Sequence, residues 1–168
     1  MIDVKPRNSM HPTKRVPRKV DLSPLRSLVG FNLRMLDLRM MKSFSEQLAD
    51  SDLTPAAATV LLVLESNPGI PLGKLADALM VRHPNMTKLV KRLVASSLVR
   101  RSMATDDKRS ISIELTGSGL QQAKKLRALQ ARHDAFVLAA LTSKEQVQLM
   151  SFVARILATL DSEERKSG

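Results

Sequence analysis

The feature that most constrains the fold is a pair of short β-like runs separated by a charged tip. Residues 98–103 read LVRRSM, and residues 110–115 read SISIEL, a strict alternation of polar and apolar residues. Such runs on either side of a polar stretch predict a β-hairpin. The stretch between them carries two acids followed by two bases: Asp106, Asp107, Lys108 and Arg109.

Two short helices joined by a tight turn are predicted just before this hairpin. The first covers residues 70–79, and the turn at Met80-Val81 leads to a second helix with Pro84 in its first turn. Apolar positions at helical spacing face inward on the first helix (Leu72, Leu75, Ala76, Leu79) and on the second (Met86, Leu89, Val90, Leu93, Val94). This order of elements is a winged helix-turn-helix, in which the second helix fits the major groove of B-DNA and the hairpin is the wing.

Longer helices are expected on both sides of this unit. Ser23-Pro24 is a helix-start signal, and apolar spacing continues to near Asp50. Thr54-Pro55 begins a helix that is apolar all round, which indicates burial, and Asn67-Pro68-Gly69 ends it. A long helix follows Thr116, and a last one covers about 142–161. The four Phe residues all lie outside 53–116, which favours a separate helical packing lobe: Phe31, Phe44, Phe136 and Phe152.

The expected class is therefore mainly α, with some β structure: a winged helix-turn-helix lobe and a helical dimerisation lobe. The predicted segments are a disordered basic arm (1–20), an N-terminal dimerisation helix (21–52), the winged helix-turn-helix (53–116), C-terminal dimerisation helices (117–162) and a tail (163–168).

The positive charge of the chain is concentrated in two places. The net charge is +11. Residues 1–20 hold six bases and one acid, and residues 82–109 hold eight bases and two acids, so these segments account for the whole excess. A neutral body with two basic segments is typical of a polyanion-binding protein. Solvated charge that only maintains solubility is the alternative, although it would be spread more evenly.

Composition excludes several other classes. Aromatic residues make up 2% of the chain, so base-stacking modules for single strands are not expected. There is no Cys and only three scattered His, so neither a metal site nor a thiol switch is expected, and no cofactor is implied. The sequence has no 18-residue apolar run and no signal peptide, so we expect a cytoplasmic protein that associates with the nucleoid through DNA.

Residues 53–120 carry a distinctive combination of short motifs. They are Leu75-Ala76 in the first helix of the motif, Pro84 and Thr87 in the second, and a wing with Leu98-Val99, Arg100-Arg101, Asp107-Lys108-Arg109-Ser110 and Leu115-Thr116-Gly117-Ser118-Gly119. With these motifs the segment resembles the MarR family of bacterial transcriptional regulators. The chain departs from the family pattern at two positions. Arg82 stands where a small polar residue often caps the recognition helix, and Ser97 stands where Gly commonly precedes the wing.

The resemblance implies a homodimer that binds double-stranded DNA on a pseudo-palindrome, and no enzyme activity. We expect base contacts from Asn85, Thr87 and Lys88, phosphate contacts from Lys91 and Arg92, and a minor-groove contact from Arg109. The full predicted set on the recognition helix is Arg82, His83, Pro84, Asn85, Thr87, Lys88, Lys91 and Arg92, and on the wing Arg100, Arg101, Asp107, Lys108 and Arg109.

The resemblance also implies a small-molecule effector, for which an aromatic carboxylate or its coenzyme A thioester is the expected class. The candidate pocket residues are Phe31, Arg34, Leu38, Arg132, His133 and Phe136. Arg34 could bind a carboxylate, although a surface role is the commoner one for Arg. His133 is more often an interface residue than a ligand contact.

Three functions thus stay open. The first is a ligand-responsive regulator, most simply a repressor. The second is a regulator of the same fold without a dedicated ligand, acting by competition with other DNA-bound proteins. The third is a basic adaptor that uses a winged helix without DNA, and a salt titration of DNA binding separates it from the other two.

Overall fold

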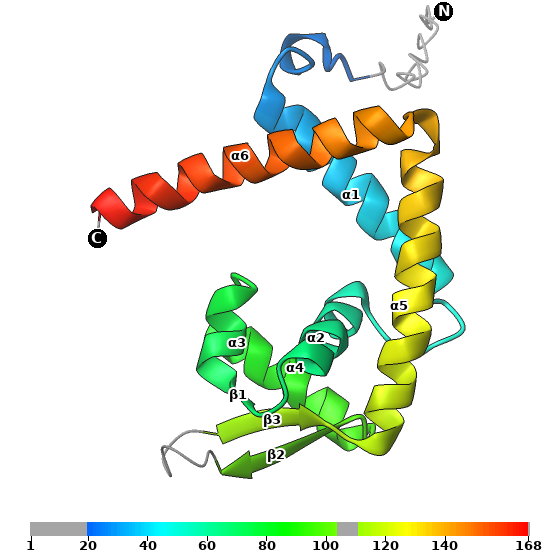
Figure 1. Ribbon diagram of the computed structural model, residues 1–168, viewed down its shortest axis with the longest axis vertical. Coiled ribbons are helices and arrows are strands. Elements are labelled where there is room, and N and C mark those ends of the chain that lie inside the picture. The colour runs from blue at the N-terminus through cyan, green and yellow to red at the C-terminus, as the bar shows by residue number, and fades with distance from the viewer. Residues whose placement is uncertain (1–19, 104–110, 168) are drawn as a thin grey trace, which may run out of the picture. The chain divides into compact units, whose positions relative to one another are not determined.

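The computed structural model describes residues 20–103 and 111–167, and a mainly α chain is confirmed (Figure 1). The described residues contain six α-helices and one small antiparallel sheet. The chain divides into two compact units, the first ending at Asp37 and the second beginning at Leu38. The predicted basic arm (1–20) lies almost wholly outside the described residues, as does the tip of the hairpin.

In the first unit, the long N-terminal helix starts later than the sequence predicted. Ser23-Pro24 begins only a single 3-10 turn, η1 (Ser23–Leu25), and the helix α1 (Val29–Gln47) starts several residues later. The Ser23 N–H donates to Asp21 Oδ1 at 2.9 Å, an arrangement that lowers the pKa of the Asp21 carboxyl. The Asn32 side chain donates to the carbonyls of Arg26 and Leu28, each at 2.8 Å. These side chains bond backbone groups of the segment before α1. Ser23-Pro24 therefore starts a separate 3-10 turn and not the long helix.

The second unit begins within α1 and continues into α2 (Pro55–Ser66). The α2 start is as predicted: Thr54 is the N-cap, its hydroxyl accepts from the Ala57 N–H, and Pro55 follows. One side of α2 is fully buried, including Val60, Leu61 and Leu64, and the helix ends before Asn67.

The sheet contains one strand more than the sequence predicted. Its order is β1-β3-β2, where β1 is Ile70–Pro71, β2 is Val99–Met103 and β3 is Ile111–Leu115. The predicted hairpin is β2 and β3, with Val99 opposite Leu115. The unpredicted β1 pairs Ile70 with Ile113 across the other edge of β3. Two residues are too few to show an alternating pattern, and Pro71 disfavours strand on local grounds.

Two helices complete the chain. The Thr116 hydroxyl caps α5 (Gly117–Val137), which lies against α2 and is followed by the 3-10 turn η2 (Leu138–Ala140). Then α6 (Ser143–Ser167) starts with a capping box, in which the Thr142 N–H donates to the Glu145 carboxylate and the Thr142 hydroxyl accepts in return. It runs beyond Asp161, where the sequence places its end, into the predicted tail.

One hydrophobic core holds together the winged unit, the part of the chain from Phe44 near the end of α1 to the end of α5. Its buried residues include Phe44 from α1, Leu48 just after α1, Leu61 and Leu64 from α2, Leu75 and Ala76 from α3 (Leu72–Ala78), Met86, Val90 and Leu93 from α4 (His83–Ala95), Val99 and Ile113 from the sheet, and Ala123 and Leu126 from α5. The exposed faces of α3, α4 and the hairpin are therefore carried on a rigid base.

Candidate nucleic-acid interface

The turn between α3 and α4 is tight because the N–H groups of Met80 and Val81 both donate to carbonyls of the last turn of α3. The Val81 N–H donates to the Ala76 carbonyl at 2.9 Å, and Met80 adopts a left-handed conformation with φ of 51°. Leu75 and Ala76 on α3 and Met86 on α4 have no exposed surface. These contacts fix how α4 is presented to solvent.

The exposed face of α4 is cationic. Asn85, Lys88 and Arg92 lie at positions i, i+3 and i+7, which places them on one stripe of the helix. Met86, Val90 and Leu93 are buried on the opposite side. The predicted recognition-helix residues that are exposed are Arg82, His83, Pro84, Asn85, Lys88, Lys91 and Arg92.

Two residues of α4 lie differently from the sequence prediction. Thr87 is only half-exposed, and its hydroxyl donates to the His83 carbonyl at 2.9 Å, so this proton is already used within the helix. Val94, predicted to face inward, is 36% exposed. It directly follows the buried Leu93, so its side chain is rotated by about 100° around the helix, away from the core.

The start of α4 lacks a side-chain cap, as the sequence indicated. Arg82 is the N-cap residue and its side chain makes no capping bond. Instead, His83 Nε2 lies 2.9 Å from Asp77 Oδ1 at the end of α3. Sequence reasoning missed Asp77, because no motif marks an acid six residues before the helix that it contacts.

The described part of the wing carries one guanidinium that is already paired. Arg100 lies opposite Glu114 across the hairpin, and its Nη2 donates to Glu114 Oε2 at 2.9 Å. This bond lowers the pKa of the Glu114 carboxyl below its ordinary value, with a smaller contribution from the Ser102 hydroxyl. Arg101 points to the other face of the strand and is exposed. The predicted tip residues Asp107, Lys108 and Arg109 lie outside the described residues.

The base of the wing is joined tightly to α5. The Ser97 carbonyl accepts from both the Thr116 hydroxyl at 2.7 Å and the Ser118 hydroxyl at 2.8 Å. Ser97 is left-handed, with φ of 57°, which explains physically why Gly suits this position. Thus the junction fixes the direction of the hairpin relative to α4 and α5.

Comparison with known proteins agrees with this geometry. Residues 51–110 match the family model described as MarR family. The DNA-bound repressor CouR superposes with a TM-score of 0.76 and 29% identity, over 83% of this chain and 99% of that one. The winged helix-turn-helix of this chain belongs to the MarR family. The protein is accordingly a DNA-binding transcriptional regulator and not an enzyme.

Similar curated proteins are regulators too. A putative transcriptional regulatory protein for the hcr operon of Thauera aromatica is 26% identical over 76% of this chain and 78% of its own length. The repressor MdtR of Bacillus subtilis is 24% identical over 85% of this chain and 92% of its own. MarR of E. coli in complex with operator DNA shares the fold, with a TM-score of 0.73 and 23% identity, over 83% of this chain and 99% of that one. Among the described residues, no helix has the length and apolarity needed to span a membrane.

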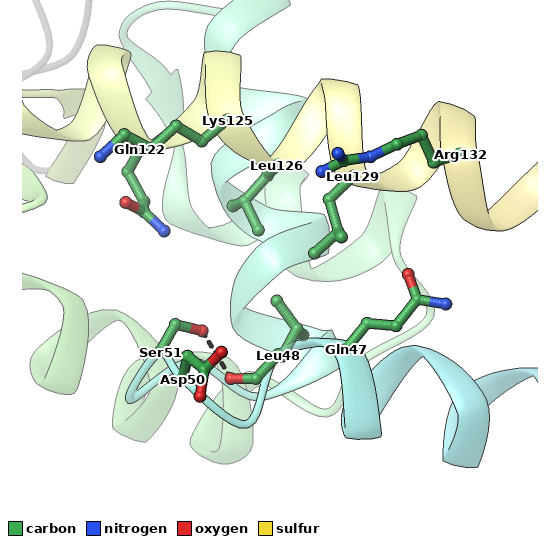
Figure 2. A pocket seen from close by; sticks show the side chains of 9 residues that line it. All are labelled: Gln47, Leu48, Asp50, Ser51, Gln122, Lys125, Leu126, Leu129 and Arg132. Carbon is green, nitrogen blue, oxygen red and sulfur yellow. Dashed lines mark hydrogen bonds between the residues drawn. The ribbon is translucent and has the colours of Figure 1, made fainter.

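A pocket of about 310 Å³ lies between the end of α1, the loop that follows it, and α5 (Figure 2). Leu126 and Leu129 on α5 point toward Leu48, and two cations of α5, Lys125 and Arg132, lie at the rim. Volumes of this order lie at the lower end of the range for small-molecule sites.

Of the predicted ligand residues, only Arg132 lines this pocket. Phe136 is 70% exposed, and Leu38 is 45% exposed. His133 is 1% exposed, and its ring lies 5.3 Å from that of Phe44, so it belongs to the packing between α1 and α5. The other two predicted residues lie in the first unit: Phe31 is half-buried, and exposed Arg34 pairs with Asp37 at 3.3 Å.

Proposed function

We propose that this protein is a homodimeric repressor that binds a pseudo-palindromic DNA site through α4 and the wing and is released by a small aromatic acid or its coenzyme A thioester. The observation that carries the DNA part is α4 itself. Its buried side is anchored by three core residues, and its free side presents Asn85, Lys88 and Arg92 in one stripe. A helix of this kind suits the major groove.

The division of roles on α4 can be tested with single substitutions. Asn85 and Lys88 lie in the first turns, where base edges are within reach, whereas Lys91 lies further along and suits a phosphate. Lys88→Ala is expected to weaken binding to the preferred site by about 1–3 kcal/mol, and Lys91→Ala to weaken all sequences alike and flatten the salt dependence by about one unit.

The measurement is fluorescence anisotropy on two duplexes: one selected by the wild-type protein from a random library, and one of scrambled sequence. Lys144→Ala removes an exposed positive charge from α6 and is the matched control. Equal losses on both duplexes for Lys88→Ala and Lys91→Ala would contradict the division of roles.

The wing is proposed to add a minor-groove contact from Arg109. Arg100 already has a carboxylate partner in Glu114, so its charge is less available to phosphate than that of exposed Arg101. We therefore expect Arg101→Ala to reduce DNA affinity more than Arg100→Ala. The same duplexes measure both variants.

The exposed apolar side of α6 supports a dimer. Water-exposed residues of this size on a soluble chain usually mark an interaction surface. Along α6 the exposed large apolar residues are Val147, Leu149, Met150, Phe152, Ile156, Leu157 and Leu160. Leu157→Glu is expected to shift the protein toward monomer in analytical ultracentrifugation. An unchanged dimer would mean that α6 is not in the interface.

The pocket between α1 and α5 supports an aromatic acid as effector. Its apolar residues suit a ring, and Lys125 and Arg132 suit a carboxylate. At about 310 Å³ it has room for a small acid, while the nucleotide part of a thioester would extend outside it.

Calorimetry with benzoate, hydroxybenzoates and their thioesters tests the effector. Binding should weaken in Arg132→Gln, and bound DNA should weaken effector binding by the factor with which the effector weakens DNA binding. If a dimer that binds DNA well bound none of these compounds, the regulator without a dedicated ligand would be the better description.

A further inference from the structure

The contact between Asp77 and His83 joins the two helices of the DNA-binding motif at the point where α4 has no cap of its own. His83 Nε2 lies 2.9 Å from Asp77 Oδ1. The ring lies near Gly73 of α3, where an added Cβ would be at ordinary contact distance, 3.5 Å from His83 Cε1. The imidazole is therefore held to α3 by its hydrogen bond with Asp77, and the absence of a side chain at Gly73 leaves space for the ring.

The start of α4 depends little on a conventional cap. Pro84 has no N–H to satisfy, and the Asn85 N–H donates to the Arg82 carbonyl at 2.9 Å. What an N-cap side chain would otherwise supply, a fixed direction of entry into the helix, is supplied here from α3. Among the described residues, Asp77 is the hydrogen-bond partner of the His83 imidazole.

The position of Asp77 points to a role beyond stability. Its carboxylate stands in the last turn of α3, where the helix dipole disfavours an anion, and beside a helix whose exposed side is cationic. Both side chains are largely exposed, at 71% for Asp77 and 62% for His83, and ion pairs of this kind contribute little to folding. An unpaired carboxylate here would also repel DNA phosphates.

We propose that His83 is a positioning residue for DNA recognition: through Asp77 it fixes the angle of α4 on α3 and neutralises the carboxylate next to the DNA-facing helix. Both effects are stronger when the imidazole is protonated, because the hydrogen bond is then charge-assisted and the pair has no net charge. DNA affinity therefore increases when the imidazole is protonated, and histidine is the side-chain type that in general changes charge between about pH 5 and pH 8.

Other charges on the two helices cannot produce this effect. Lysine and arginine side chains do not change charge in that range. The ionisable groups on α3, on α4 and at its N-cap are Lys74, Asp77, Arg82, His83, Lys88, Lys91 and Arg92.

The test measures affinity for the library-selected duplex at about pH 6 and about pH 8, at constant ionic strength. The full-length wild type should bind about three- to tenfold more tightly at the lower pH, because one negative charge that repels DNA phosphates is then compensated, an effect of about the size of one exposed charge–charge interaction. His83→Gln keeps an N–H donor but cannot become charged. Asp77→Asn keeps the acceptor but has no charge. Each should abolish most of the pH difference.

Circular dichroism and the unfolding midpoint show whether each variant is folded, and Lys144→Ala should keep the wild-type pH profile. A pH difference that persists in Asp77→Asn would overturn the proposal, because His83 would then act on DNA directly. A wild type whose affinity is the same at both pH values would also overturn it. The proposal rests on α4 as the DNA-reading helix. That assumption fails separately, if Lys88→Ala leaves affinity unchanged at a fixed pH.

Discussion

Among the described glycines, Gly119 is the one at which an added methyl group should most reduce the stability of the winged unit. It lies in the first turn of α5, where the helix meets the base of the wing. A Cβ built there would lie 1.9 Å from the Leu98 carbonyl oxygen and 3.3 Å from Leu115 Cδ2. The first contact is with backbone, and that carbonyl accepts from the Thr116 N–H at 3.0 Å. It therefore cannot turn aside without losing a hydrogen bond.

Gly119→Ala must separate α5 from the wing by roughly 1 Å, in a region packed like a crystal. Overpacking of this kind costs about 1–3 kcal/mol, and the loss of the hydrogen bond from Thr116 adds about 1 kcal/mol. We expect the free energy of unfolding to fall by about 2–4 kcal/mol, which lowers the melting temperature by about 5–15 °C for a chain of this size. DNA affinity should fall as well, since the junction directs the wing.

Gly117→Ala is the matched control. Gly117 is two residues away in the same turn, and a Cβ there would have no neighbour within 4 Å. Its substitution should leave stability unchanged or raise it by up to about 1 kcal/mol. Urea unfolding of both variants at one protein concentration gives the comparison, because the stability of the proposed dimer would depend on concentration. A difference between the two variants below about 0.5 kcal/mol would refute the close packing described here.

Three further substitutions test other features of the fold. Ser97→Gly should raise the free energy of unfolding by about 0.5–1 kcal/mol in thermal denaturation, since it relieves the left-handed conformation, and a decrease would argue against that strain. Arg100→Gln should return the pKa of Glu114 toward its ordinary value in an NMR titration. The stabilisation from this pair is present above the ordinary carboxyl pKa and is lost as the pH falls through the lowered pKa of Glu114. If the pKa of Glu114 did not change in the variant, Arg100 would be excluded as the cause of its lowering. His133→Leu should raise stability by about 1 kcal/mol, because both ring nitrogens are buried and have no hydrogen-bond partner among the described residues, and a loss would show that the packing of the ring against Phe44 outweighs that cost.

The winged unit could be predicted well from sequence because its signals are local. Thr54-Pro55 and Thr116 mark helix starts by side-chain chemistry that acts within one turn, and the structure has both caps. The same kind of signal failed at Ser23-Pro24. There Asp21 and Asn32 bond the backbone of the turn, so the chain forms η1 in place of continuous helix.

The remaining features depend on contacts that sequence spacing does not record. β1 exists because Ile70 meets Ile113, more than forty residues away, and not because of its own two residues. Asp77 bonds to His83, and Glu114 bonds to Arg100, in each case from a neighbouring helix or strand. Both partners are predicted DNA-contact residues. A list of exposed cations on α4 and the wing therefore overstates the charge that each one offers to DNA.

Two regions between α1 and α5 differ in their accessibility to a ligand. His133 and Phe44 fill the space between α5 and α1, and neither ring is accessible, so a ligand can reach that layer only by moving α1 away from α5. The pocket about one turn away, at Leu129 and Arg132, is already open. A ligand bound there contacts both α1 and α5. We expect a change in that packing to reach the base of the wing through α5, because Gly119 of α5 approaches the Leu98 carbonyl too closely to leave space for a methyl group.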